Sequence, residues 1–143
     1  MLERDLCLII GHSLDWYHKI SDYGGVRHGV LPFDLFGVLN NKPIYIEAKF
    51  SKKPEAFNLQ RIQDHQLENL MEVKRLCPLA QCWVVLGVNF SRGDTRVYVF
   101  DDLDNLKKRR DSKDNILKKE LMSLPYYPIK KGKIVWELVT PEK

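Results

Sequence analysis

The stretch PFDLFGVLNNKPIYIEAKF (residues 32–50) decides the fold, because it predicts two strands joined by a turn. Two apolar runs flank NNKP, whose asparagines tolerate a left-handed backbone and whose proline suits the first residue or the edge of a strand. The second run is apolar except for Glu47 and Lys49, which point to the same face because side chains alternate along a strand. We expect a turn at residues 40–43 that brings positions 34 and 49 roughly opposite each other.

Asp34, Glu47 and Lys49 then converge on one patch, and their chemistry predicts a metal site. Two carboxylates suit Mg²⁺, with Mn²⁺ as a substitute, because a hard cation takes oxygen ligands and keeps several waters. The lysine can orient a water and steady charge on a phosphate. The alternative is that Glu47 and Lys49 form the solvated face of a hairpin. Gln66 favours the functional interpretation, because its place in an apolar helical stripe demands a polar neighbour.

The remaining chain predicts further elements by its apolar spacing. Helices are expected over residues 5–20 and 59–77, and residues 101–122 predict one or two short surface helices. QCWVVLGVNF, TRVYVFD and KIVWELV read as strands, and LPYYPIKKG reads as a loop. We detect no repeat and no domain boundary, so residues 1–143 are expected to form one α/β domain in the order α-β-β-α-β-β-α-β.

Composition excludes several classes of protein. With 44% hydrophobic and 29% charged residues, the 143-residue chain has the make-up of a globular domain. Its three cysteines contain no CxxC pair, which argues against a disulfide framework or a zinc ribbon and favours a reducing, cytoplasmic setting. Its longest apolar runs are too short to cross a bilayer, so we expect no membrane association. A formal charge of +4 favours a polyanionic partner.

The order P-x-D followed by E-x-K in a strand-turn-strand context resembles the PD-(D/E)XK nuclease superfamily, with Asp34, Glu47 and Lys49 on its signature positions. The downstream helix QDHQLENLMEVKRL narrows the resemblance to the RecU family of Holliday junction resolvases. The resemblance implies a restriction-endonuclease-like fold with a central mixed sheet flanked by helices. It also implies that Asp34 and Glu47 are metal ligands, Lys49 the catalytic lysine, and Gln66 an active-site residue.

Further site residues follow from the same comparison. The family's opening helix carries an acidic residue after an apolar one, and Leu14 and Asp15 have that order. Asp15 is therefore a candidate third metal ligand, and a solvated helix face is the alternative. DNA phosphates can be held by basic residues in two loops. These are Arg27 and His28 in the glycine-rich loop, and Lys52 and Lys53 after the second strand. For Arg27 and His28, ordinary solvation of the loop is the alternative. The basic run LKKRRDSKDNILKK contains interspersed acids, which favours a solvated helix face over a DNA contact.

Our hypothesis is a Mg²⁺-dependent DNA endonuclease that acts in recombination and repair. It would cut branched DNA, above all four-way junctions, as a homodimer, because two symmetric nicks need two sites. One alternative is another nuclease of this superfamily, of the restriction, repair or flap type. A DNA-binding module without catalysis is a second alternative, which the intact acidic pair argues against. A protein-interaction scaffold is a third.

Overall fold

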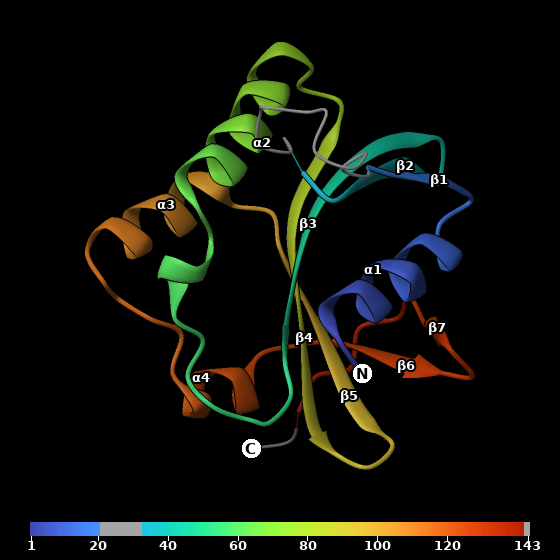
Figure 1. Cartoon of the computed structure of the whole chain (residues 1–143), viewed down its shortest axis with the longest axis vertical. Helices are drawn as coiled ribbons and strands as arrows, with labels where there is room; N and C mark the ends of the chain where they lie inside the picture. The colour runs from blue at the N-terminus through green and yellow to red at the C-terminus, as the bar shows by residue number, and fades with distance from the viewer. Residues whose placement is uncertain (21–32, 142–143) are drawn as a thin grey trace, which may run out of the picture.

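A seven-stranded mixed sheet runs through the computed structural model, which describes residues 1–20 and 33–141 (Figure 1). The strands lie in the order of their numbers, and only β3 and β4 pair in parallel. They are β1 (Trp16–Lys19), β2 (Leu35–Leu39), β3 (Lys42–Ser51), β4 (Gln81–Ser91), β5 (Asp94–Phe100), β6 (Tyr127–Lys130) and β7 (Lys133–Ile134). Helices flank both faces of this sheet, so the predicted α/β class with a central mixed sheet is confirmed.

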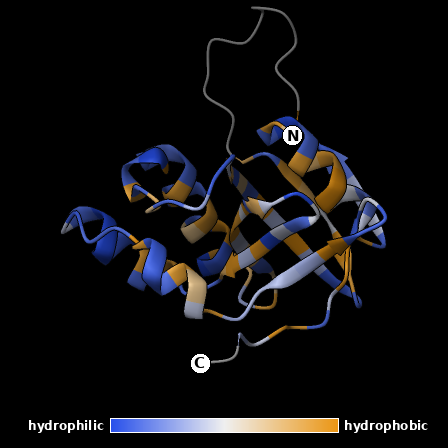
Figure 2. Ribbon diagram, turned by 90° about the horizontal axis from the view of Figure 1, so that it is seen from below, coloured by the Kyte–Doolittle hydropathy of each residue, from blue (hydrophilic) through white to orange (hydrophobic). Residues whose placement is uncertain are grey.

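The helices divide the hydrophobic core into two parts. They are α1 (Glu3–His12), the 3₁₀ helix η1 (Leu59–Arg61), α2 (Asp64–Leu76), α3 (Leu103–Asp111) and α4 (Lys118–Ser123). Buried residues of α1 pack on one face of the sheet, and those of η1, α2, α3 and α4 pack on the other. Hydrophobic residues accordingly lie on the strands and on the inner sides of the helices, whose outer sides are hydrophilic (Figure 2). In the part of the chain that the structure describes, no helix is long and apolar enough to cross a membrane.

The helix expected over residues 5–20 is shorter than predicted. It ends at His12, and the chain turns back to form β1, which pairs antiparallel with β2. Aromatic residues favour a strand over a helix, and that preference outweighs the helical spacing of Tyr17 and Ile20. β1 lies so close to β2 that a Cβ atom on Gly37 would stand 2.2 Å from the carbonyl oxygen of Trp16.

Two later predictions also need correction. The helix expected over residues 59–77 is divided, because η1 ends before α2 begins at Asp64. The segment expected to be a loop contains β6, whereas the last predicted strand is reduced to β7 and a bridge between Tyr126 and Val139. The one or two short helices expected over residues 101–122 are present as two, α3 and α4. That residues 1–143 form one domain stays a prediction.

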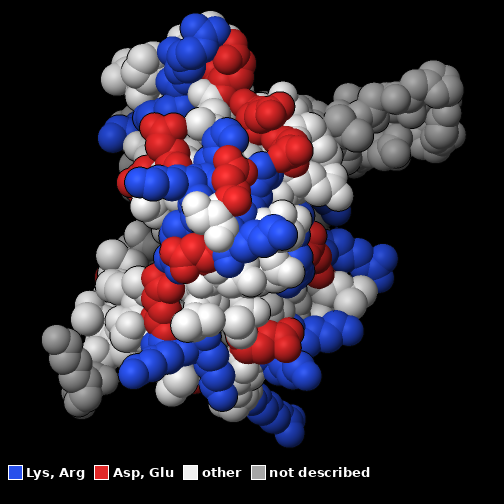
Figure 3. All heavy atoms as spheres, turned by 90° about the vertical axis from the view of Figure 1, so that its left-hand side faces the viewer, with Lys and Arg blue, Asp and Glu red and all other residues white. Residues whose placement is uncertain are grey.

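Arg110 joins α3 to the beginning of α2. Its side chain is buried, and it donates a hydrogen bond of 3.0 Å to the carbonyl oxygen of Ile62 and forms an ion pair with Asp64. Gln60 donates in return to the Arg110 carbonyl oxygen at 2.6 Å. These contacts fix where α2 starts. These contacts also use a cation of the basic run. Figure 3 shows acids and bases interleaved over much of the face that carries α3, which favours the solvated-face interpretation.

Candidate active site

The β2–β3 hairpin positions the acidic residues. Its turn consists of Asn40 and Asn41 alone, both with positive φ (51° and 66°), a conformation that asparagine adopts more readily than most residues. Because the turn has two residues and not four, Leu35 pairs with Ile46. Extending this register by one residue places Asp34 opposite Glu47, so the expected pairing with position 49 was wrong. A shift of two residues keeps the same face, and the three residues still converge.

Asp34 is held by the backbone of β3. Its own N–H donates to the Ile46 carbonyl oxygen at 3.0 Å, and its Oδ2 accepts the N–H of Ala48 at 2.7 Å. β2 begins only at Leu35, so the Asp34 carboxylate occupies the position that the next backbone carbonyl would take. This contact fixes the carboxylate beside Glu47.

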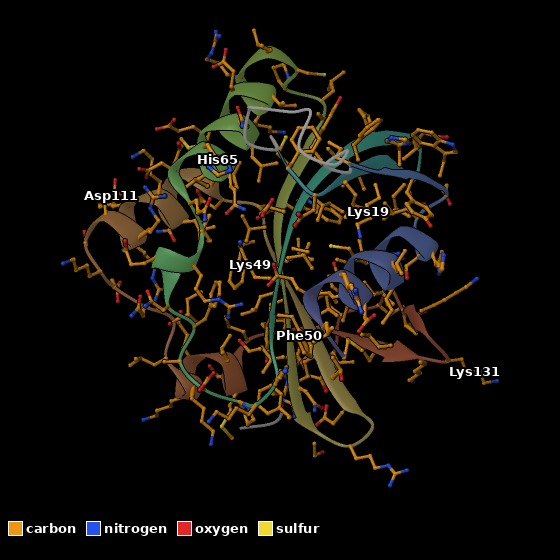
Figure 4. All side chains as sticks on the ribbon, viewed as in Figure 1. Lys19, Lys49, Phe50, His65, Asp111 and Lys131 are labelled. Carbon is orange, nitrogen blue, oxygen red and sulfur yellow. The ribbon has the colours of Figure 1, made fainter. Side chains whose placement is uncertain are left out.

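Lys49 lies at the centre of the molecule, on β3 between α2 and α1 (Figure 4), and Glu47 lies two residues before it on the same strand. Glu47 is 2% exposed and Lys49 is 7% exposed, and Lys49 Nζ lies 3.5 Å from Glu47 Oε1. On the neighbouring strand they pair with Val84 and Leu86, which are fully buried. The two charged groups therefore lie beside buried apolar residues, and they form an ion pair with each other.

Burial controls the ionisation of both acids. Burial, together with the nearby Asp34 carboxylate, raises the pKa of Glu47 to about 8 against the opposing charge of Lys49. Burial also raises the pKa of Asp34, opposed by the Ala48 N–H, the Lys49 charge and hydrogen bonding to Glu47. One lysine does not balance two ionised carboxylates at this depth, so the site favours an additional cation.

A divalent cation with few protein ligands fits this donor set. Across residues 1–20 and 33–141, no cluster of three or more His, Cys, Asp or Glu side chains has the geometry to hold a metal ion. A hard divalent cation can be held by one or two carboxylates and complete its coordination with water and phosphate oxygens. Asp34 and Glu47 are the residues that would hold it.

Gln66 lies near the start of α2, where it caps the helix. Its Oε1 accepts the N–H of Gln63 at 2.9 Å, and the side chain is half-buried. The buried positions of the helix are Leu67 and Leu70, so the prediction that Gln66 lies in the middle of the apolar stripe was wrong. His65, in the same first turn, is half-buried and labelled in Figure 4.

Asp15 does not join the acidic pair. Its Oδ2 accepts the N–H of Asn40, at 2.9 Å, beside the hairpin turn. Asn40 lies six residues along the chain from Asp34, or roughly 20 Å at the rise of an antiparallel strand. Asp15 thus supports the turn, and the structure separates it from the site.

Glu3 and Arg61 border the site and were missed in the sequence. Glu3 Oε2 accepts the N–H of Phe50 at 3.3 Å and is one of the charges that raise the pKa of Glu47. Arg61 Nη2 lies 3.4 Å from Glu3 Oε2 and donates to the Phe50 carbonyl oxygen at 2.9 Å. No sequence signal links residues so far apart, because only the fold brings the start of α1 and the end of η1 to the edge of β3.

The predicted DNA-binding residues lie in two places. Lys52 and Lys53 are exposed just after β3, and Lys53 Nζ lies 3.9 Å from Glu55 Oε2. Arg27 and His28 lie outside the described residues.

A mixed sheet that carries Asp34, Glu47 and Lys49 at adjoining positions of a hairpin has the arrangement expected of the PD-(D/E)XK superfamily. The sequence profile of RecU (Recombination protein U) matches residues 20–137, which is most of the chain, and the chain belongs to that family. The predicted superfamily and family are therefore confirmed.

Individual relatives are similar over part of their length. The chain is 31% identical over 103 residues to the Holliday junction resolvase RecU of Bacillus subtilis (strain 168), a match that covers 69% of this chain and 46% of that protein. The chain thus spans about half of the curated relative. Among solved structures, it is similar to the 1.6 Å structure of Archaeoglobus fulgidus Hjc, a Holliday junction resolvase from an archaeal hyperthermophile. That similarity has a TM-score of 0.42 at 19% identity and covers 68% of this chain and 69% of the other.

Proposed function

We propose that this protein is a Mg²⁺-dependent DNA endonuclease that resolves four-way junctions by paired cuts. The observation that carries the proposal is the buried Glu47 beside Asp34 and Lys49. Two acids that face a polyanion weaken DNA binding unless a cation separates them from the phosphate, so this pair is of little use to a protein that only binds DNA. Family membership supports the same activity.

Asp34 and Glu47 would hold the metal. When bound, a divalent cation supplies Lewis-acid chemistry, polarising the scissile phosphate and making a nearby water more acidic. Mg²⁺ suits the donor set, and Mn²⁺ should substitute because it takes the same oxygen ligands. The Ala48 N–H, which donates to Asp34 Oδ2 at 2.7 Å, keeps this carboxylate oriented beside Glu47.

Lys49 is the basic side chain that forms an ion pair with Glu47 among the residues that the structure describes. From its position 3.5 Å from Glu47, its ammonium group can orient the attacking water and stabilise the charge that develops on the phosphate. Gln66 would contribute from the start of α2 with its side-chain amide. Both are proposed as catalytic residues, Lys49 through charge and Gln66 through hydrogen bonding.

DNA binding would rest on phosphate contacts by Lys52 and Lys53, together with Arg27 and His28. Such contacts release counterions and make affinity fall steeply with salt, without reading sequence. Two active sites are needed to cut opposing strands of a junction symmetrically, and a two-fold homodimer supplies them.

The test is cleavage of labelled DNA by the purified full chain. A mobile four-way junction, a flap, a linear duplex and a single strand are each incubated with Mg²⁺, with Mn²⁺ and with EDTA. We expect symmetric pairs of nicks in the junction, activity with either metal, none in EDTA, and a dimer at micromolar concentration by sedimentation. Glu47→Gln should abolish cleavage, and Glu72→Gln, the same change on the exposed face of α2, should leave it intact.

The outcomes separate the parts of the proposal. Cleavage that persists in EDTA or in Glu47→Gln refutes the metal-dependent nuclease. A monomer that cuts duplex as fast as junctions refutes junction resolution but not the chemistry, and it favours a restriction-type, repair or flap nuclease.

A further inference from the structure

Four aromatic side chains form what we call the aromatic patch: Trp16, His18, Phe36 and Tyr45. They lie on three adjacent strands, since His18 pairs with Phe36 across β1 and β2, and Phe36 pairs with Tyr45 across β2 and β3. Tyr45 precedes Glu47 by two residues on β3. Side chains two apart share a face, so the patch and the acidic pair lie on the same side of the sheet.

The aromatic patch has two half-buried rings that pack together and two exposed rings at its outer side. Phe36 and Tyr45 are half-buried and stack on each other, with ring centroids 6.2 Å apart and planes at 24°. Trp16 and His18 approach Phe36 at 5.8 Å and 5.5 Å and are both exposed, Trp16 to 53%. The exposed indole is thus supported by packed rings that limit its motion, which lowers the entropy cost of stacking another ring on it.

The position of the patch relates it to the proposed site of cleavage. Phe36 and Tyr45 each lie two residues from Asp34 or Glu47, or about 7 Å along a strand. Trp16 is paired with Val38, four residues from Asp34, which is roughly 14 Å. One turn of duplex DNA spans about 34 Å, so the patch lies within one turn of a phosphate bound at the acidic pair. The bases next to that phosphate can therefore reach the patch.

We propose that the aromatic patch is a stacking subsite for an unpaired base next to the scissile phosphate, with Trp16 as its outer platform; the inference rests on the proposed nuclease function. Aromatic side chains stack on every base, because each base has a π-face, and they do so only where the base is outside a duplex. Branch points, flaps and single strands offer such bases, and a continuous duplex does not. The subsite would therefore favour branched DNA independently of the acids.

The size of the patch argues for a base and against a second copy of the chain. A stable protein interface buries about 800 Å² on each partner. An aromatic side chain offers about 150–250 Å² when fully buried, and two of the four rings are already half-buried. The patch falls short of an interface by a wide margin, whereas a nucleobase covers one or two rings.

The experiment measures binding without cleavage. Dissociation constants are determined in EDTA for a fluorescently labelled single strand, the matching duplex and a four-way junction. We expect Trp16→Ala to weaken binding of the single strand and the junction about 5- to 100-fold, the range for losing one base–aromatic stack, and to change duplex binding less than about twofold. Trp16→Phe should retain most of the affinity. Leu117→Ala, an exposed apolar residue before α4, is the control and should bind as wild type.

A second readout is tryptophan fluorescence. Stacking should quench Trp16, so addition of an unlabelled single strand should quench wild type more than Trp16→Phe, which retains the packed Trp83 and Trp136. Equal affinities of wild type and Trp16→Ala for all three DNAs, with no quenching specific to Trp16, would overturn the inference. So would a variant that changes only from dimer to monomer, since the patch would then join two copies. If Trp16 is quenched but no DNA is cut with Mg²⁺, the proposed nuclease fails and the base subsite stands.

Discussion

Replacing Glu47 with Gln should stabilise the metal-free protein, and by an amount that grows with pH. The folded protein raises the pKa of Glu47 from 4.5 to about 8, chiefly by burial. Between these values the unfolded chain has released the proton that the folded chain still binds, so stability is full below pH 4.5 and is lost as pH rises through about 8. Glutamine resembles the protonated acid and carries no such dependence.

The magnitude follows from the same values. One pH unit within this window costs about 1.36 kcal/mol, so wild type at pH 7 has lost about 3 kcal/mol relative to pH 4.5. Urea unfolding in EDTA at pH 5, 7 and 9 measures the free energy of unfolding of wild type and Glu47→Gln. We expect the two proteins to be close at pH 5 and the variant to lead by about 3 kcal/mol at pH 7.

The control is Glu72→Gln, because Glu72 is exposed and Arg75 holds its pKa below the usual range. Glu72 loses its proton below the pH range in which Glu47 changes stability. The unfolding free energy of Glu72→Gln should therefore change with pH in the same way as that of wild type at all three pH values. Parallel curves for wild type and Glu47→Gln would refute the reasoning, because they would mean that Glu47 is as easily ionised in the folded chain as in the unfolded one.

Three further variants test the remaining contacts. Asp34→Asn should abolish cleavage in a gel assay while DNA binding stays equal or tightens, since the amide oxygen can still accept the Ala48 N–H and a repelling charge is gone; undiminished cleavage would contradict it. Lys49→Ala should lower the single-turnover rate by roughly 10²–10³-fold at unchanged circular dichroism, as expected for a group that stabilises transition-state charge; normal cutting by a destabilised protein would make Lys49 structural. Arg110→Ala should lower the free energy of unfolding in urea by about 2–3 kcal/mol, because the hydrogen bond to Ile62 is lost. An unchanged unfolding midpoint would show that this hydrogen bond does not stabilise the fold.

The hairpin was predictable because its signals are local. Alternation along the strand correctly places Glu47 and Lys49 on one face, and the asparagines correctly indicate the turn. Turn length was not predictable from composition, since Pro43 suited a four-residue turn as well as the first residues of a strand. The error moved the partner of Asp34 by two residues and left the face unchanged, which is why the convergence of the three residues was still predicted.

Contacts between residues far apart in the chain could not be predicted from the sequence. Asp15 seemed a candidate ligand only while the first helix was extended to residue 20, and the aromatic residues that follow it pair with β2 instead. Gln66 fits an apolar stripe on a helical wheel, but α2 starts late enough that this residue caps it. Glu3 reaches the site from the other end of the chain, and nothing in its neighbourhood indicates that.

The C-terminal half of β3 has a consequence for how variants at Asp34 would behave. β3 continues past Ile46, which pairs with Leu35, the first residue of β2. In this part, which is unpaired on the β2 side, the N–H groups of Ala48 and Phe50 donate hydrogen bonds to the carboxylates of Asp34 and Glu3. Unpaired N–H groups along a strand edge invite pairing with another chain, and side chains that occupy them protect against it. Asp34→Ala would therefore remove a proposed metal ligand and also expose an unpaired strand edge. A variant that lacks this acid would remain soluble more easily with asparagine at the position than with alanine.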